Sequence, residues 1–237
     1  MSNYFLLNFF TLLFPFLLSF HKRIRFYKNW KALFLAICVT GIFFITWDII
    51  FTYKAVWGFN GEQVSGIYFA YLPIEEILFF FVVPYSSVFT YETIKILNFS
   101  ELPEKVHRSI SILLIIVLLV LLVSFYSQLY TFYVCLLTTS LLILLEFILH
   151  VTWMKWFYIV FGILLVPFLI MNGLLTSAIM GSVVVWYNNN QIIGLRLYSI
   201  PLEDVFYGMS LILMNIAVYE FFKSKKSPII RSSYKSE

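Results

Sequence analysis

The sequence predicts an all-α integral membrane protein with about seven transmembrane helices, arranged as two parallel three-helix repeats joined by a linker helix. Composition is the first reason: 62% of the 237 residues are hydrophobic and only 12% are charged, whereas about 25% of a typical soluble domain is charged. The second is the number of apolar runs long enough to cross a bilayer. The third is a set of residues that recurs at a spacing of 128 positions.

Seven apolar runs approach the roughly 20 residues that a membrane-spanning helix needs. The first run has neither a basic start nor a small-residue cleavage site, so we expect a retained helix rather than a signal peptide. The apolar stretch from Ile179 to Tyr187 is too short to span, and we expect an interfacial or re-entrant piece there. The seven runs cover about 3–20, 31–53, 73–95, 109–127, 129–149, 156–175 and 201–222.

These runs divide the chain into four parts. Residues 1–108 form the first repeat, 109–128 the linker helix, 129–223 the second repeat and 224–237 a basic tail. Because each repeat has an odd number of helices, a single linker helix restores the direction of the chain. The two repeats are therefore expected to have the same orientation in the membrane.

The repeat is clearest where a proline and two acids open an apolar run, at Pro73-Ile74-Glu75-Glu76 and again at Pro201-Leu202-Glu203-Asp204. A proline followed by acids is also ordinary chemistry at the start of a helix, and one such motif alone would not indicate a site. Two motifs at the same depth favour a functional role. The matching positions are Gly66, Pro73, Glu75, Tyr91, Glu92 and Lys95 in the first repeat, and Gly194, Pro201, Glu203, Tyr219, Glu220 and Lys223 in the second.

The basic residues predict the orientation. Only Lys54 and Arg196 fall on one face of the seven-helix arrangement, and the other fourteen Lys and Arg residues fall on the opposite face. Basic loops lie in the cytoplasm, so we expect the N-terminus outside and the C-terminus inside. The same loops, beside anionic headgroups, account for the net charge of +4 without nucleic acid.

Ionisable groups within membrane segments usually face a bundle interior, a pathway or a reaction site. Asp48 lies five residues before the end of the second run, near the level of the Glu75–Glu76 pair, and Asn172 lies at a comparable depth in the sixth run. Adjacent residues on a helix point about 100° apart. One acid of each pair can therefore face the interior, and the sequence leaves open which one does.

The remaining acids have structural interpretations. Glu92 and Glu220 each precede a lysine by three residues, which favours surface pairs within one helix. Glu146 has His150 four residues later, and a structural pair is a better interpretation of that spacing than a second site.

Aromatic side chains accompany the acids. An aromatic belt at the membrane interface would account for most of them, yet a ring face also stabilises a cation. Acids beside an aromatic cavity would suit proton-initiated carbocation chemistry on a hydrophobic polyene. The side chains that we expect to contact such a substrate are Trp57, Phe79, Phe80, Trp186, Tyr207 and Asn172.

At this point the sequence resembles the heterodimeric-type lycopene cyclases, in the form where the two halves are fused in one bacterial chain. The resemblance is most specific over residues 46–95 and 172–223. It implies conversion of the ψ ends of lycopene to β-ionone rings without net redox change. Two departures, Asp204 in place of Glu and Asn172 in place of Asp48, put equal activity of the two halves in doubt.

The resemblance also implies which groups act. A protonated carboxyl group would start the reaction, with Glu75 and Glu76 as the first candidates, Glu203 and Asp204 as the second, and Asp48 as an orienting or relay group. We expect no cofactor and no metal, and the G-x-G-x-x-G fingerprint does not occur in the sequence. The expected partners are lycopene or a related acyclic carotenoid, the lipid bilayer and, with less to support them, other carotenoid enzymes.

Other functions remain open at this stage. A proton- or cation-coupled transporter could also place carboxylates at a repeat interface, although the acids here cluster at one level. A retinal-binding protein needs a lysine within a span, and the last run has none between Pro201 and Phe222. A membrane prenyltransferase would need paired aspartate-rich motifs for magnesium. A non-catalytic scaffold is the last alternative.

Overall fold

The computed structural model describes residues 2–225, which form seven long helices and three short two-stranded sheets. The predicted basic tail lies outside the described residues from position 226 onward. The helices are α1 (Asn3–Leu18), α2 (Trp30–Tyr53), α3 (Ile74–Ile96), α4 (Glu104–Ser124), α5 (Leu129–Leu142), α6 (Met154–Thr176) and α7 (Leu202–Lys225). A π-helix, Ile143–Ile148, continues α5, and short 3-10 turns occupy Phe26–Asn29, Ala178–Met180 and Asn189–Gln191.

Six of these helices are long and apolar enough to cross a membrane, so the protein is a multi-pass membrane protein as the sequence predicts. Helix α1, with 16 residues, is shorter than the run predicted for it. At 1.5 Å per residue it extends about 24 Å, somewhat less than the roughly 30 Å hydrocarbon core of a bilayer.

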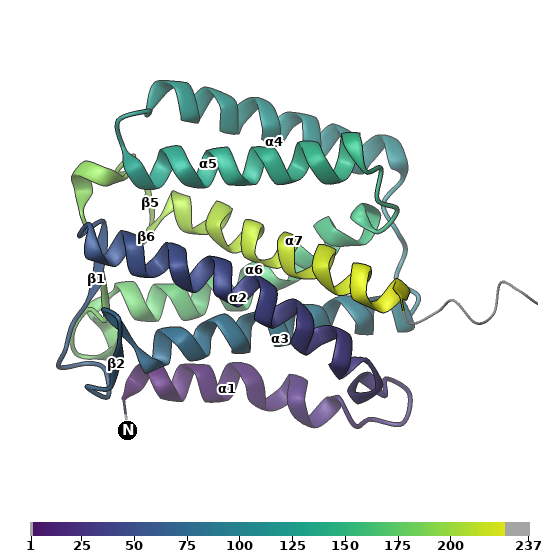
Figure 1. Cartoon of the computed structure of the whole chain (residues 1–237), viewed down its shortest axis with the longest axis horizontal. Helices are drawn as coiled ribbons and strands as arrows, with labels where there is room; N and C mark the ends of the chain where they lie inside the picture. The colour runs from purple at the N-terminus through teal and green to yellow at the C-terminus, as the bar shows by residue number, and fades with distance from the viewer. Residues whose placement is uncertain (1, 226–237) are drawn as a thin grey trace, which may run out of the picture.

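The helices lie side by side with their ends at two faces of the bundle (Figure 1). Helix α1 packs on α3, α3 on α2, α2 on α7, α7 on α5 and α5 on α4, and α6 contacts α3, α4 and α7. All the strands gather at one end, here called the strand end, where the N-terminus also lies. The other end, here called the basic end, holds the connections 19–29, 97–103 and 149–153 and the end of α7.

The strand end explains the repeated proline-acid motif. Strands β2 (Tyr68–Phe69) and β3 (Leu72–Pro73) form one hairpin, and β5 (Arg196–Leu197) and β6 (Ile200–Pro201) form another at the same 128-residue spacing. Each proline ends its hairpin and directly precedes its helix. Two glycines with positive φ, Gly66 at 78° and Gly194 at 86°, start the matching hairpins in the left-handed region that favours glycine.

A third sheet joins the two halves. Strand β1 (Trp57–Phe59) pairs with β4 (Val185–Tyr187) in antiparallel register, with Gly58 opposite Trp186. The flanking bonds are reciprocal: the N–H of Asn60 donates to Val184 O at 2.8 Å, and the N–H of Asn188 donates to Val56 O at 2.9 Å. The two bonds are equivalent under the 128-residue offset, because Asn60 corresponds to Asn188 and Val56 to Val184.

The stretch Ile179–Tyr187 thus ends in a strand of this sheet, and its interfacial or re-entrant position stays a prediction. Part of it forms a 3-10 turn, and its last three residues form β4 and pair with the first half of the chain. The sequence analysis did not predict this strand, because a strand of three residues, which depends on a partner distant in sequence, has no periodic signal of its own.

The basic end also joins the halves, through ion pairs that the sequence analysis assigned wrongly. Lys95 Nζ lies 2.9 Å from Glu220 Oε1, and Lys223 pairs with Glu92. Both pairs link α3 to α7, whereas the i,i+3 spacing had suggested pairs within one helix. The Tyr91 hydroxyl also donates to Glu220. The 128-residue offset relates Lys95 to Lys223 and Glu92 to Glu220, so the two ion pairs are equivalent. Together they hold α3 against α7 at the basic end.

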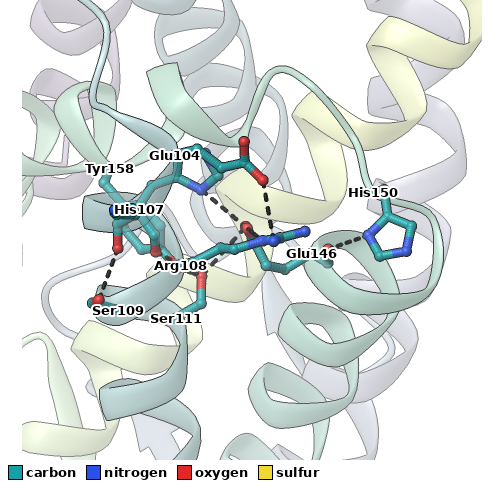
Figure 2. Close-up of polar contacts among 9 residues, drawn as sticks. Glu104, His107, Arg108, Ser109, Ser111, Glu146, His150 and Tyr158 are labelled. Carbon is teal, nitrogen blue, oxygen red and sulfur yellow. Dashed lines mark hydrogen bonds and ion pairs between the residues drawn. The ribbon is translucent and has the colours of Figure 1, made fainter.

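Helix α4 is attached by a buried polar cluster at the basic end (Figure 2). Glu146, in the π-helix, lies 3.0 Å from His107 Nδ1 and 3.7 Å from Arg108 Nε, and Ser111 Oγ donates to it at 3.4 Å. His150 contacts only the backbone oxygen of Glu146, with Nδ1 3.2 Å away. The side-chain partners of Glu146 therefore come from α4 rather than from His150 of its own segment, and its structural role stays a prediction.

Replacing Glu146 by alanine should destabilise the protein, because it leaves buried His107 without its partner, whereas Arg108 is 42% exposed and keeps its pair with Glu104. Leaving a buried polar group without its partner costs about 1–3 kcal/mol. Unfolding of the purified protein in mixed detergent micelles measures the loss. Glu104→Ala is the control: this acid is exposed and pairs with Arg108 at 3.1 Å, and exposed pairs contribute about 0–1 kcal/mol. Equal, small losses in both variants would show that the cluster does not hold α4.

Candidate functional site

A small cavity of about 60 Å³ lies inside the bundle near the strand end. Six helices and the central sheet contribute to it, and three of its side chains are carboxylic acids. Residues from both halves of the chain line it together. They are Tyr4, Asp48, Trp57, Phe59, Glu76, Phe79 and, from the second half, Tyr130, Phe168, Asn172, Leu175, Val185, Tyr187, Asp204 and Tyr207.

Asp204, in the first turn of α7, accepts three hydrogen bonds from neutral donors. Tyr130 OH donates to Oδ1 at 2.7 Å, and Asn172 Nδ2 and Tyr187 OH each donate to Oδ2 at 2.8 Å. An ionised carboxylate only accepts hydrogen bonds, so this set of donors matches the charged form. The donors come from α5, α6 and β4, and they fix the orientation of the carboxylate.

Glu76 and Asp48 have fewer donors. Glu76 Oε2 accepts one hydrogen bond, from Tyr4 OH at 2.6 Å. Asp48 interacts with the Trp57 side chain and lies close enough to Glu76 for their charges to interact. Its Oδ2 is buried and has no hydrogen-bond partner. A buried carboxyl oxygen without a donor is costly in the ionised form, whereas a protonated carboxyl can itself donate.

The first acid of each motif points elsewhere. Glu75 is fully buried, and its Oε1 accepts hydrogen bonds from the backbone N–H of Ser65, at 2.7 Å, and from the Ser2 hydroxyl. It therefore ties the loop before β2 and the start of α1 to the start of α3.

Glu203 does the same in the second half. Its Oε1 accepts from the backbone N–H of Ile193 and from the Thr131 hydroxyl, both at 2.6 Å. Ser65 and Ile193 are 128 residues apart, so the two loop bonds are equivalent. Within each pair, the first acid binds a loop and the second faces the cavity.

Aromatic rings make up much of the wall. The Trp57 ring centroid lies 4.9 Å from that of Tyr130 and 6.3 Å from that of Tyr207, and Tyr130 stacks on Tyr187 at 6.2 Å. Tyr187 is on β4, outside the membrane-spanning helices. Burial and then the Asp204 carboxylate raise the pKa of its phenol well above the usual range. The phenol thus stays a hydrogen-bond donor at any physiological pH.

The cavity brings together most, but not all, of the side chains that the sequence suggested. Asp48, Glu76, Asp204, Asn172, Trp57, Phe79 and Tyr207 line it, and Glu75, Glu203, Phe80 and Trp186 do not. The Trp186 ring lies over Gly58, where an added Cβ would come within 2.4 Å of it. Phe80 lies one turn beyond Glu76 on α3, on the side of the basic end, and packs against Phe44 with ring centroids 6.3 Å apart.

The sequence analysis missed the tyrosines that hold the acids. Tyr4 and Tyr130 lie near the starts of α1 and α5, where interfacial tyrosines are common, and nothing local distinguishes them. Both helices start at the strand end, so the sequence does place Tyr4 and Tyr130 at the same depth as the acids. That shared depth was the signal that could have predicted their contacts with the acids. Among residues 2–225, no group of three His, Cys, Asp or Glu side chains is placed to hold a metal ion.

Comparison with known families gives one result. A model of the lycopene cyclase family matches residues 2–94 and 127–222, which together are most of the chain. The chain belongs to the lycopene cyclase family. No curated protein and no solved structure matches it significantly.

The lycopene cyclase match covers all of the acid cavity but only part of the polar cluster around Glu146. Every residue that lines the cavity lies within the matched segments. The match leaves out 95–126, which contain α4 with His107, Arg108 and Ser111. The cavity therefore belongs to the part of the chain that shares the family's sequence pattern, and the contacts of α4 with Glu146 do not.

Glu75→Ala should loosen the loop 54–73 at the strand end, because the Ser65 N–H loses its acceptor. Hydrogen bonds to charged groups contribute about 1.5–3 kcal/mol each. Limited proteolysis of the protein in detergent should therefore cut the segment 54–73 faster than in wild type. Glu62→Ala, at an exposed acid of the same loop, is the control and should leave the rate unchanged. An unchanged rate in Glu75→Ala would contradict the loop-binding role.

Proposed function

We propose that the protein is a lycopene β-cyclase, an isomerase that converts ψ end groups to β-ionone rings, giving γ-carotene or β-carotene, by proton-initiated cyclisation without net redox change. The observation that carries the proposal is the convergence of Asp48, Glu76 and Asp204 on one aromatic cavity. Two of these acids come from the first half and one from the second. We further propose that the halves, 1–108 and 129–223, arose by duplication and form a single composite site.

The proton donor is the Asp48–Glu76 pair. Two neighbouring carboxyl groups in a desolvated site share one proton, because both cannot be charged at low cost. The buried Oδ2 of Asp48 has no donor, as is also true of Oε2 in Glu75 and Glu203. Of these three acids only Asp48 lines the cavity, so a proton retained there could reach the substrate. Addition of that proton to C2 of the terminal C1=C2 alkene leaves a tertiary cation at C1. The C5=C6 alkene attacks C1, closes the ring and moves the cation to C5.

The proton acceptor is Asp204. Its three hydrogen bonds keep it oriented and ionised, and loss of the C6 proton to it gives the C5=C6 double bond of the β ring. One proton is added and one removed, so the reaction is an isomerisation. The proton then returns to the Asp48–Glu76 pair, and the cavity is large enough for a water molecule that could carry it.

The aromatic walls stabilise the cation between these two steps. Trp57, Tyr130 and Tyr207 present ring faces and edges within one cluster, and a desolvated ring face contributes about 2 kcal/mol to a cation. The rings also limit the water that could capture the cation as an alcohol. Glu75 and Glu203, the other acids of the motifs, support this site by fixing the loops that cover it.

Expression in a host that accumulates lycopene tests the proposal. Cyclic carotenes in the pigment extract are the expected result. Unchanged lycopene, with the protein present in the membrane, would contradict the cyclase function and leave the coupled transporter as the alternative. Purified protein in lipid, supplied with lycopene alone, should also form product. A strict requirement for reduced flavin or a nicotinamide cofactor would contradict the isomerisation mechanism.

The strand end should face outward from the cell membrane and the C-terminus should lie in the cytoplasm, because the basic end carries the excess of Lys and Arg. A fluorescent reporter fused to the C-terminus, which matures only in the cytoplasm, should be active. Activity of a C-terminal alkaline phosphatase instead, which needs the periplasm, would reverse the orientation.

Replacing the cavity acids by their amides should abolish turnover while the protein stays folded. Glu76→Gln, Asp48→Asn and Asp204→Asn keep the shape of each side chain and remove its proton-transfer capacity, so losses of about 10²-fold or more are expected. Initial rates of ring formation in lipid vesicles, per folded molecule, measure the effect.

Glu75→Gln and Glu203→Gln are the matched comparison, one residue earlier in each motif. They should mainly lower stability, by weakening the loop bonds. If the first acid of each motif instead shows the larger loss of turnover per folded molecule, the assignment of roles within the pairs is wrong. Normal turnover in all five variants would remove carboxylates from the mechanism.

A further inference from the structure

The size of the acid cavity raises the question of where the rest of the substrate lies. A space of about 60 Å³ accommodates an end group only with some opening of its walls, and it cannot hold a long polyene as well. This inference rests on the proposed function, because the substrate is taken to be an acyclic carotenoid. The polyene therefore needs a second space, apolar and continuous with the first.

An apolar pocket of about 260 Å³ meets this requirement. It lies between α1, α3, α6 and α7, deeper in the bundle than the acids, and none of its lining residues is ionisable. Phe14 and Pro15 line it from α1, Ser87 from α3, Leu164 from α6 and Ile212 from α7. Phe14 is 67% exposed on the outside of the bundle, so the pocket borders the surface that lipid covers.

Phe168 is the wall that the two spaces share, since it lines both. It lies one turn from Asn172 on α6, and Gly208 lies one turn from Asp204 on α7. Residues four apart share a helix face. The layer that joins Asn172 to Asp204 is thus followed, toward the basic end, by a layer that joins Phe168 to Gly208. A Cβ on Gly208 would come within 3.0 Å of two atoms of the Phe168 ring.

The first half of the chain has the same two layers without the glycine. Helices α2 and α6 start at Trp30 and Met154, 124 residues apart, and this offset relates Phe44 to Phe168. The 128-residue offset relates Phe80 to Gly208. Phe44 and Phe80 are both buried, and their rings stack at 6.3 Å with an interplanar angle of 19°. Where the first half has two rings, the second half has one ring and a gap.

The next layer differs in the same way. Between α2 and α7, buried Asn215 donates to Thr40 Oγ1 at 2.6 Å and closes the interface. The same offsets relate Thr40 to Leu164 and Asn215 to Ser87, and these two residues line the apolar pocket instead of bonding to each other. In this layer the pocket therefore lies at the α3–α6 interface, and the equivalent α2–α7 interface is closed. The apolar pocket between α2, α5 and α7 lies nearer the basic end and shares no lining residue with the acid cavity.

We propose that this pocket holds the polyene arm of the substrate, that the substrate enters it from the bilayer between α1 and α6, and that Phe168 is the positioning residue at the passage into the acid cavity. Gly208 leaves the room for the Phe168 ring to move aside when an end group passes. The equivalent passage in the first half is closed by Phe44 and Phe80. The site therefore takes one end group at a time, from one side.

Two substitutions test the proposal on the full chain in lipid nanodiscs. Gly208→Leu narrows the passage, and Ser87→Leu fills the pocket. Each is assayed with lycopene and with a short acyclic isoprenoid that has the same end group but no polyene arm. Gly162→Leu is the matched control, because an added Cβ there meets nothing within 4 Å. Binding of lycopene, from the shift of its absorption band, is measured separately from turnover.

Gly208→Leu should lose about 10-fold or more of its turnover on both substrates, because each end group must cross the passage. Ser87→Leu should lose about 10-fold or more on lycopene relative to the short substrate, since a misfit of a few carbon atoms changes specificity on this scale. Ser87→Leu should also weaken lycopene binding by about 10-fold, and Gly162→Leu should behave like wild type. Combining Gly208→Ala with Phe168→Leu should recover part of the loss seen in Gly208→Ala alone, because the smaller side chain relieves the contact.

The outcomes separate this proposal from the cyclase function. Equal losses of Ser87→Leu on both substrates would overturn the polyene assignment, and so would normal lycopene turnover in Ser87→Leu and Gly208→Leu when the wild type cyclises. A loss of Gly208→Leu on lycopene alone would overturn the passage at Phe168. If wild type binds lycopene without cyclising it, the function fails, and weaker binding by Ser87→Leu would still support the pocket. No lycopene binding by wild type would overturn both.

Discussion

The arrangement of this protein depends on the cost of burying carboxylates at the level of the membrane. Four acids open the two central helices, and each needs a partner, because an uncompensated buried charge costs several kcal/mol. Glu75 and Glu203 find theirs in backbone N–H groups of the loops at the strand end, which brings each loop back over its own helix start. The hairpins β2–β3 and β5–β6 complete that return. The hydrogen bonds of the first acid in each pair thus hold a loop over the helix start, and this loop covers the cavity that the second acid faces.

This constraint explains why some parts of the structure follow from the sequence and others do not. The helices follow from apolar runs, and the position of the acids near the strand end follows from their place at helix starts. Adjacent residues on a helix diverge by about 100°, so the sequence indicates that the acids of a pair separate, but not which faces inward. That choice depends on the backbone N–H groups of Ser65 and Ile193. They can donate to Glu75 and Glu203 only after the loops fold back.

The ion pairs at the basic end show the same limit. Glu92 and Lys95 have a spacing that suits a pair within one helix, and so do Glu220 and Lys223. In the folded chain the lysines exchange partners across α3 and α7. Local spacing cannot distinguish these arrangements, because both satisfy the same charges. Glu146 is similar: His150 is nearer in sequence, but His107 and Arg108 approach from α4.

The positions at which the two halves differ are more informative for the proposed mechanism than the positions at which they match. In the layer that faces the cavity, the first half has two acids, Asp48 and Glu76, and the second has Asn172 and Asp204. An amide can donate to a neighbouring carboxylate, whereas a second acid can do so only when it carries a proton. The Asn172–Asp204 bond therefore suits an ionised acceptor, and the Asp48–Glu76 pair suits a retained proton. In the proposed mechanism a duplicated, nearly symmetric bundle thereby acquires a donor on one side of its cavity and an acceptor on the other, and the single asparagine in place of an aspartate is what separates the two roles.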